Sequence, residues 1–243
     1  IRKGQGVTPT AYATHLHQYI SRGMEAFLSA LDITGSPHQQ RVITIATTPA
    51  MGALLMPGLA SALKPTFPQI LLHNIAIVDA ARQLDQRQVD LLIDTHLHSG
   101  QAISHHVLYQ DRVQMYCRAG HPALDGPQDE TTLAEYEFAL LLPEGQRYPT
   151  LHRRLQEEMG ERRCGFSTFN LMTQAAMIAG SDMLGLTTER LFAMVSRLWP
   201  LQTLDFPSLG GEQIDVALHF NKLSGKEPLL KEIIETVIRS FKA

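Results

Sequence analysis

The sequence predicts an α/β fold of two lobes, preceded by one long helix, and three observations lead to this prediction. From Arg41 onward, short β-rich segments alternate with helical segments. The alternation occurs in two successive sets, with the turn-rich loop HPALDGPQDE at 121–130 between them. A helix with regular apolar spacing precedes the first strand, separated from it by the helix-breaking run TGSP at 34–37. Two α/β lobes in one chain typically leave a ligand-binding cleft between them, at the carboxyl ends of strands.

The composition is typical of a soluble globular protein. Hydrophobic residues make up 44% of the 243 residues, and no uninterrupted apolar run is long enough to cross a bilayer. The formal net charge of −3 means that any contact with nucleic acid must be local or made by a part outside this sequence. Cys117 and Cys164 are too few for a disulfide framework, and no segment resembles a signal peptide, so we expect a cytoplasmic protein without membrane contact.

The first element is predicted to be a helix that pairs with a second copy of itself. Thr8 or Thr10 can cap it beside Pro9, and it should continue to about Asp32. Its apolar positions step by three or four, as in the seam of two paired helices: Ala13, Leu16, Ile20, Met24, Phe27 and Leu31. The alternative is an amphipathic helix that lies on its own domain. We favour pairing, because a flexible joint separates this helix from the first strand.

The first set of elements reads as β-α-β-α-β. Strands are expected at 41–47, 69–77 and 89–94, with a helix at 50–64 and another that begins after Asp79. Such a unit predicts a sheet that is parallel in part. Two further β-rich segments follow, AISHHVLY at 102–109 and DRVQMYCRA at 111–119.

A second set of strands and helices follows. Its predicted strands are 138–142, 164–169, 184–188, 199–206 and 213–220, and its predicted helices are 150–160, 170–179 and 228–241. The last helix carries one broad apolar stripe, which should pack on a sheet.

Four segments resemble LysR-type transcriptional regulators. IRKGQGVTPT is similar to the end of their DNA-binding wing and the start of their linker helix, and LLMPGLASALKPTFPQI to their leucine-proline helix and the strand after it. QLDQRQVDLLI is similar to their helix, turn and Asp-led strand. RAGHPAL is similar to their His-Pro-Leu-Ala turn, with Ala123 and Leu124 inverted. Pro9-Thr10 is closest to the nodulation-regulator and LeuO-like branch.

The resemblance implies a domain organisation. Residues 1–8 would be the end of a winged helix-turn-helix, with Arg2 and Lys3 on the DNA backbone, and 9–36 the dimerisation helix and joint. A periplasmic-binding-protein-like effector domain would follow, with lobe I at 37–136 and 206–243 and lobe II at 137–205. The chain would then cross between lobes near 136–137 and 205–206. DNA would be bound through an N-terminal domain outside this sequence, by a homodimer or homotetramer.

In this family a small-molecule effector sits between the lobes. The candidate ligand-binding residues here lie at strand ends and helix starts: Thr47, Thr48, Pro49, Ala50, Asp94, Thr95, Ser167, Thr168, Phe169 and Thr187, with Leu186 behind them. Hydroxyls and free N–H groups at the start of the first-lobe helix suit a carboxylate or another oxyanion. Asp94 would oppose a simple anion, so the charge of the effector stays open. The alternative for Thr48 is that it only caps the helix and does not bind the effector.

Other chemistries find less support. His96, His98, His105 and His106 crowd into one connection, but no ligand pattern accompanies them, so we expect solvated histidines and no metal. The sequence has no G-x-S-x-G elbow, P-loop or H-E-x-x-H motif, so we expect no enzyme and no cofactor. An enzyme with the same bilobal fold is the alternative, and a solute-binding protein for transport is a third possibility.

Overall fold

The structure is a computed structural model that describes residues 10, 12, 16, 17, 19–21, 23, 24, 41–142, 163–205 and 213–242. The chain divides into two compact units, Ile1–Arg41 and Val42–Ala243. In the first unit, every described position from Tyr12 to Met24 is helical, in agreement with the predicted helix. Leu16, Ile20 and Met24 of the expected seam are exposed. Arg2, Lys3, Ala13, Phe27 and Leu31 lie outside the described residues, as does the helix predicted at 150–160.

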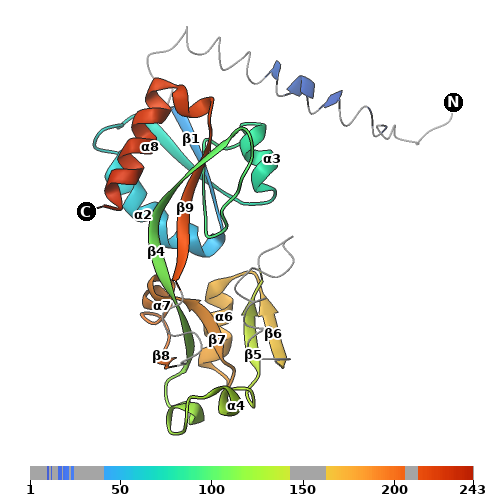
Figure 1. Cartoon of the computed structure of the whole chain (residues 1–243), viewed down its shortest axis with the longest axis vertical. Coiled ribbons are helices and arrows are strands. Elements are labelled where there is room, and N and C mark those ends of the chain that lie inside the picture. Colours follow the sequence, from blue (N-terminus) through green and yellow to red (C-terminus); the bar gives the residue numbers. More distant parts are fainter. Residues whose placement is uncertain are drawn as a thin grey trace, which may run out of the picture. The chain divides into compact units, whose positions relative to one another are not determined.

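The second unit contains both predicted sets of elements (Figure 1). Its first set comprises β1 (Arg41–Thr47), α2 (Pro49–Leu63), β2 (Ile70–Ala76), α3 (Ala80–Asp85), β3 (Leu91–Asp94) and β4 (Ile103–Arg118). Its second set comprises α4 (Glu130–Leu133), β5 (Phe138–Leu141), β6 (Cys164–Thr168), α6 (Leu171–Ala179), β7 (Gly185–Thr188), α7 (Glu189–Val195), β8 (Leu201–Leu204), β9 (Gln213–Asn221) and α8 (Pro228–Ser240). Two short 3-10 turns, Pro122–Leu124 and Ser224–Lys226, complete the described elements. Helices α4 and α7 were not predicted from the sequence.

The main sheet is parallel in part, as predicted. Its strand order is β2-β1-β3-β9-β4-β7, and β8 also pairs with β4. β1 and β3 run parallel, with Ile45 opposite Leu91, whereas β9 runs antiparallel to both β3 and β4. A small sheet of parallel β5 and β6 joins the second lobe through a bridge between Phe138 and Leu184.

Strands β4 and β9 lie side by side and connect the two lobes (Figure 1). The first half of β4 pairs with β9, from Ile103 opposite Asn221 to Arg112 opposite Gln213, with a register shift between Val107 and Tyr109. Its second half, from Val113 onward, pairs with β7 and β8. The two segments expected at 102–109 and 111–119 are therefore one strand.

The first passage between the lobes therefore lies within β4 and not near Tyr136–Glu137. Val113, Met115 and Leu133 belong to the same buried cluster as Phe138 and Leu184, so residues 113–136 pack with the second lobe. Gln110 separates the two predicted β-rich segments, but residues 110–112 remain paired with β9. The second crossing, expected near Asp205–Phe206, borders residues 206–212, which the structure does not describe.

The largest buried cluster lies between helices α2 and α8 and the strands of the first lobe. The apolar stripe of α8 buries Leu230, Ile233, Ile234 and Val237 there, as the sequence predicts. Leu171 and Ala175 of α6, and Leu191 and Val195 of α7, belong to the same cluster. Apolar packing therefore continues from α2 into the second lobe. On the other face of the sheet, α3 covers a smaller cluster around Leu84 and Leu92.

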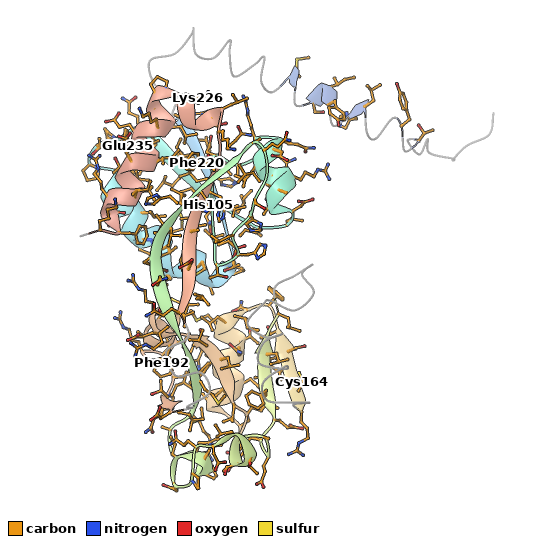
Figure 2. The ribbon with its side chains drawn as sticks, in the orientation of Figure 1. His105, Cys164, Phe192, Phe220, Lys226 and Glu235 are labelled. Carbon is orange, nitrogen blue, oxygen red and sulfur yellow. The ribbon has the colours of Figure 1, made fainter. Side chains whose placement is uncertain are left out.

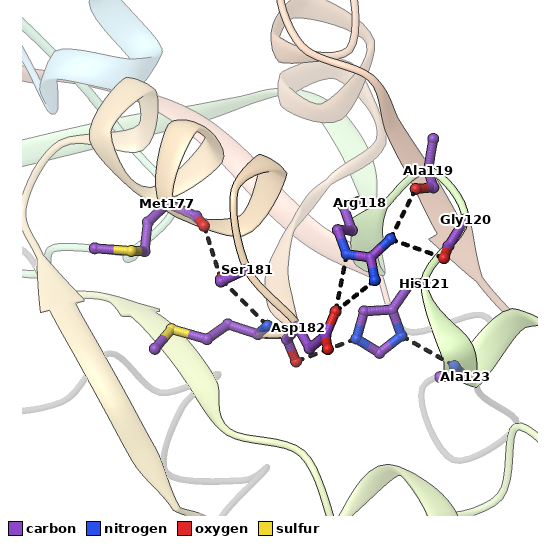
Figure 3. A network of polar contacts seen from close by, with 9 residues as sticks. Arg118, Ala119, Gly120, His121, Ala123, Met177, Ser181 and Asp182 are labelled. Atoms are coloured by element: carbon purple, nitrogen blue, oxygen red, sulfur yellow. Dashed lines mark hydrogen bonds and ion pairs between the residues drawn. The ribbon is translucent and has the colours of Figure 1, made fainter.

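The motif RAGHPAL forms a structural turn after β4 (Figure 3). His121 is fully buried, its Nε2 donates to the carbonyl oxygen of Asp182 at 3.1 Å, and its Nδ1 accepts from Ala123 N–H at 3.0 Å. Arg118 binds the Asp182 carboxylate through Nη2 at 2.6 Å and the Gly120 carbonyl through Nη1 at 2.8 Å. Gly120 has a φ of 68°, a conformation that a residue without a side chain adopts at no cost. The motif thus ties the turn to the second lobe.

None of the helices that the structure describes combines the length and the apolar character needed to cross a bilayer.

Candidate functional site

Two of the predicted site residues lie at the carboxyl ends of neighbouring parallel strands. Thr47 ends β1 and stands opposite Ile93, the residue before Asp94 at the end of β3. The sheet therefore brings Thr47 and Asp94 to one edge, which is where open α/β sheets bind ligands.

Thr47 is enclosed beneath the first turn of α2. Its side chain is 1% exposed, and its Oγ1 accepts a hydrogen bond of 3.0 Å from Asn74 Nδ2, which also binds the Ile45 carbonyl. A Cβ added at Gly52 would lie 2.8 Å from Thr47 Oγ1, so only glycine allows this close approach. The sequence analysis had missed Asn74. Because Asn74 occupies an acceptor position of Thr47, the Thr47 hydroxyl remains free to donate.

Thr48 caps α2, as the simpler of its two interpretations predicts. Its Oγ1 accepts from Met51 N–H at 3.4 Å, and Pro49 occupies the first helical position. Thr48 is half-buried, Pro49 is exposed and Ala50 is buried. This cap uses one lone pair of the Thr48 hydroxyl and leaves its proton for a hydrogen bond to another group.

Asp94 is buried and both its oxygens have partners. Its side chain is 5% exposed, Oδ1 accepts from Thr95 N–H at 2.7 Å, and Oδ2 lies 2.8 Å from His98 Nε2. Thr95 itself is exposed. Asp94 therefore holds the loop after β3, and its negative charge faces a histidine within the protein.

Two histidines of the predicted cluster, His98 and His105, lie beside a fifth histidine that was not predicted from the sequence. His219 on β9 is fully buried, and its Nε2 accepts from the main-chain N–H of His98 at 3.1 Å. The His96 ring lies 4.8 Å from that of His98, and the His105 ring 5.8 Å from that of His219. Burial, with a smaller contribution from His98, lowers the pKa of His219 to about 4. Among the described residues, no three groups are arranged to hold a metal ion.

The second lobe contributes residues at the end of β6 and on β7. Thr168 accepts from Asn170 N–H at 3.2 Å, and Asn170 caps α6, while Ser167 and Phe169 are exposed. Thr187 is 5% exposed, and its hydroxyl has no hydrogen-bond partner among the described residues. A buried hydroxyl without a partner costs about 1–3 kcal/mol, so a ligand that pairs with it would recover this energy.

Helix packing brings the two lobes together behind these residues. Helix α2 packs directly against both α6 and α7. The capped starts of α2 and α6 thus belong to elements in contact. The arrangement offers hydroxyl and N–H groups, while none of the ten predicted binding residues is basic.

Two α/β lobes joined by paired crossing strands define a periplasmic-binding-protein-like domain, and known structures share this fold. The transcriptional regulator PA0477 from Pseudomonas aeruginosa superposes with a TM-score of 0.75 at 18% identity, over 98% of this chain and 80% of that chain. The regulatory domain of CrgA, a LysR-type regulator from Neisseria meningitidis, superposes with a TM-score of 0.64 at 13% identity, over 83% of this chain and 99% of that chain.

Sequence comparison identifies the family. The model of the LysR substrate binding domain matches residues 36–242, and the chain therefore belongs to the family of LysR-type transcriptional regulators. The HTH-type transcriptional regulator YbeF of Escherichia coli (strain K12) is 47% identical over 241 residues, which are 99% of this chain and 76% of YbeF. The HTH-type transcriptional regulator SyrM 2 of Sinorhizobium fredii (strain NBRC 101917 / NGR234) is 23% identical over 218 residues, 85% of this chain and 61% of SyrM 2.

Proposed function

We propose that this chain is the sensing and assembly portion of a cytoplasmic LysR-type regulator, and that a small molecule bound between its lobes controls transcription. DNA would be bound through a winged helix-turn-helix, as the names of the HTH-type relatives suggest. The observation that carries the proposal is the Thr187 hydroxyl, which is buried without a partner on a lobe whose helices pack against α2.

The chemistry of the candidate residues favours a ligand that accepts hydrogen bonds. Thr47 and Thr48 each accept a bond within the protein and have a hydroxyl proton left to donate. Asp94 accepts from Thr95 and lies against His98, and it is buried, so its carboxylate is already directed at groups of the protein. A carboxylate, phosphate or carbonyl group fits this pattern of donors.

A bilobal enzyme is the alternative function. The relatives and the matching structures are named as transcriptional regulators, which favours a ligand that is bound and released unchanged. Mass spectrometry after long incubation separates the two functions, because an enzyme would consume the ligand.

The first prediction concerns ligand binding. In a thermal-shift screen of metabolites, a ligand that bridges the lobes should raise the melting temperature by mass action. Thr48→Trp should abolish this shift, because the indole would fill the space in front of α2. Thr48→Ala is the control, since it removes the helix cap and one donor without filling the space, so it should lower the melting temperature and weaken the shift without abolishing it. A shift that survives Thr48→Trp would contradict the placement of the site.

Thr187 and Thr188 provide a matched pair for the same screen. Both hydroxyls are buried without partners, but successive residues of a strand point to opposite faces. Each Thr→Val change should stabilise the free protein, because it removes an unpaired hydroxyl. Only Thr187→Val should weaken ligand binding, by about 2- to 10-fold for one hydrogen bond. Equal weakening by both variants would show that Thr187 does not contact the ligand.

The second prediction concerns assembly. The exposed Leu16, Ile20 and Met24 should pair with a second copy of the helix, so the full chain should form dimers or tetramers. A chain that lacks residues 1–36 should form smaller assemblies under the same conditions. Light scattering coupled to size-exclusion chromatography measures both masses. A strictly monomeric full chain at micromolar concentration would refute pairing.

A further inference from the structure

Tyr109 lies where β4 passes between the lobes, and it contacts one element from each lobe. It immediately follows the register shift in β4, and its side chain is 9% exposed. The guanidinium carbon of Arg190, on α7 of the second lobe, lies 4.0 Å from the centre of the Tyr109 ring. The ring of Phe241, at the end of α8 in the first lobe, stacks on Tyr109 with 5.5 Å between centroids and 18° between planes.

Asp111 adds a second link between the crossing strand and α7. It is 4% exposed, and its Oδ1 accepts from the main-chain N–H of Arg190 at 3.4 Å. Thr188, which precedes α7, forms no side-chain cap, so the carboxylate on β4 takes this role. Tyr109 and Asp111 are two residues apart on one strand and therefore point to the same face. Arg190 is thus held by its main chain and its side chain at the same point of β4.

The contact also contains an unfavourable group. The Tyr109 hydroxyl is buried and has no hydrogen-bond partner within the part of the chain that the structure describes. Burial, with Asp111 adding to it, raises the pKa of Tyr109 to about 12, so the hydroxyl is neutral and protonated at physiological pH. The cation–π and stacking contacts favour the observed arrangement, whereas the unpaired hydroxyl opposes it. Favourable and unfavourable contacts thus meet at one residue, so a second arrangement would lose the first and relieve the second.

We propose that Tyr109, Asp111, Arg190 and Phe241 form a latch that holds the two lobes at one angle, and that a second arrangement exists in which the latch is released. In the released arrangement α7 moves away from β4 and the Tyr109 hydroxyl reaches water. The two arrangements differ in the angle between the lobes, because Arg190 and Phe241 belong to different lobes. This inference goes beyond the proposed function and requires no effector.

Spin labels on the two lobes can test the latch. Cys164 is exposed on the second lobe, and Glu235 is exposed on α8 of the first lobe (Figure 2). Cys117 is buried, and burial raises the pKa of its thiol to about 11, so it should not react with the label. The doubly labelled Glu235→Cys chain, diluted with unlabelled chain, then reports the distance between lobes within one molecule by pulsed electron spin resonance.

Arg190→Gln and Tyr109→Phe should act in opposite directions. Arg190→Gln removes the cation and should raise the population of a second distance at least threefold. Tyr109→Phe removes the unpaired hydroxyl and should reverse this change when it is combined with Arg190→Gln. Arg197→Gln changes an exposed arginine after α7 and is the matched control, with the distribution of the parent.

The outcomes are distinct. A growing second distance in Arg190→Gln that the added Tyr109→Phe suppresses supports the latch, provided that circular dichroism shows all variants folded. Identical distributions in the parent and in Arg190→Gln overturn it. A second distance that grows in Tyr109→Phe also overturns it, because the hydroxyl would then favour the observed arrangement.

Discussion

The protein should lose stability as the pH falls from 6.5 to 4, and replacing His219 with glutamine is expected to abolish most of this loss. The ring is fully buried, and its Nε2 accepts from His98 N–H. Protonation would turn Nε2 into a donor that faces another donor. The pKa of His219 is therefore lowered from 6.5 to about 4, chiefly by burial.

The sign of the pH dependence follows from proton binding. Between pH 6.5 and 4 the unfolded chain binds a proton at residue 219 and the folded chain does not, so the free energy of unfolding falls as the pH falls. Above pH 6.5 both states are neutral at this residue and its effect is constant. The loss is at most about 3 kcal/mol and is smaller where solvent screens the ring.

Urea unfolding at several pH values between 7.5 and 4.5 measures this effect. His219→Gln keeps an acceptor near the position of Nε2 but cannot titrate. Its free energy of unfolding should therefore change less over this pH range than that of the parent or of His105→Gln. His105→Gln is the control, because His105 is exposed and stands opposite His219 in the sheet. His98, Asp94 and His105 also face His219, and all three are present in both the parent and His219→Gln. Equal slopes for these two proteins would contradict the prediction.

The elements of the fold were predictable where a local pattern determines them. The β-rich runs at 41–47 and 164–169 and the apolar stripe of α8 each specify one element within a few residues. The passage between lobes was not predictable in this way. The sequence predicts two β-rich segments that are interrupted at Gln110, and pairing with distant β9 makes them one continuous strand.

The residues of the candidate site also differ in whether a local pattern predicts them. Thr47 and Asp94 follow buried strands, so their place at a sheet edge could be predicted. Asn74 and His219 could not, because Asn74 binds a residue 27 positions away and His219 one 121 positions away. A polar residue inside a strand is the one local signal they give, and it does not identify a partner.

Gly185→Ala is expected to destabilise the protein by about 1–3 kcal/mol, the usual cost of adding a methyl group to a filled core. A Cβ at this position of β7 would lie 2.3 Å from Ile178 Cδ1 and 2.8 Å from Tyr116 Cε1. Both side chains are fully buried. Tyr116 cannot move aside freely, because its hydroxyl donates to Gln174 Oε1 at 3.1 Å and Gln174 Nε2 donates to the Ala139 carbonyl at 2.7 Å.

A double-mutant cycle separates this collision from the general effect of replacing glycine. Ile178→Val removes the nearest methyl group, so adding it to Gly185→Ala should cost less than the sum of the two single changes. Gly58→Ala is the control: nothing lies within 4 Å of the added Cβ on α2, and the protein should gain about 0.5–1 kcal/mol. Chemical denaturation gives the free energies of unfolding of the four proteins in the cycle and of Gly58→Ala. Strict additivity at Gly185 and Ile178 would mean that Tyr116, fixed through Gln174, and not Ile178, excludes a side chain from this position.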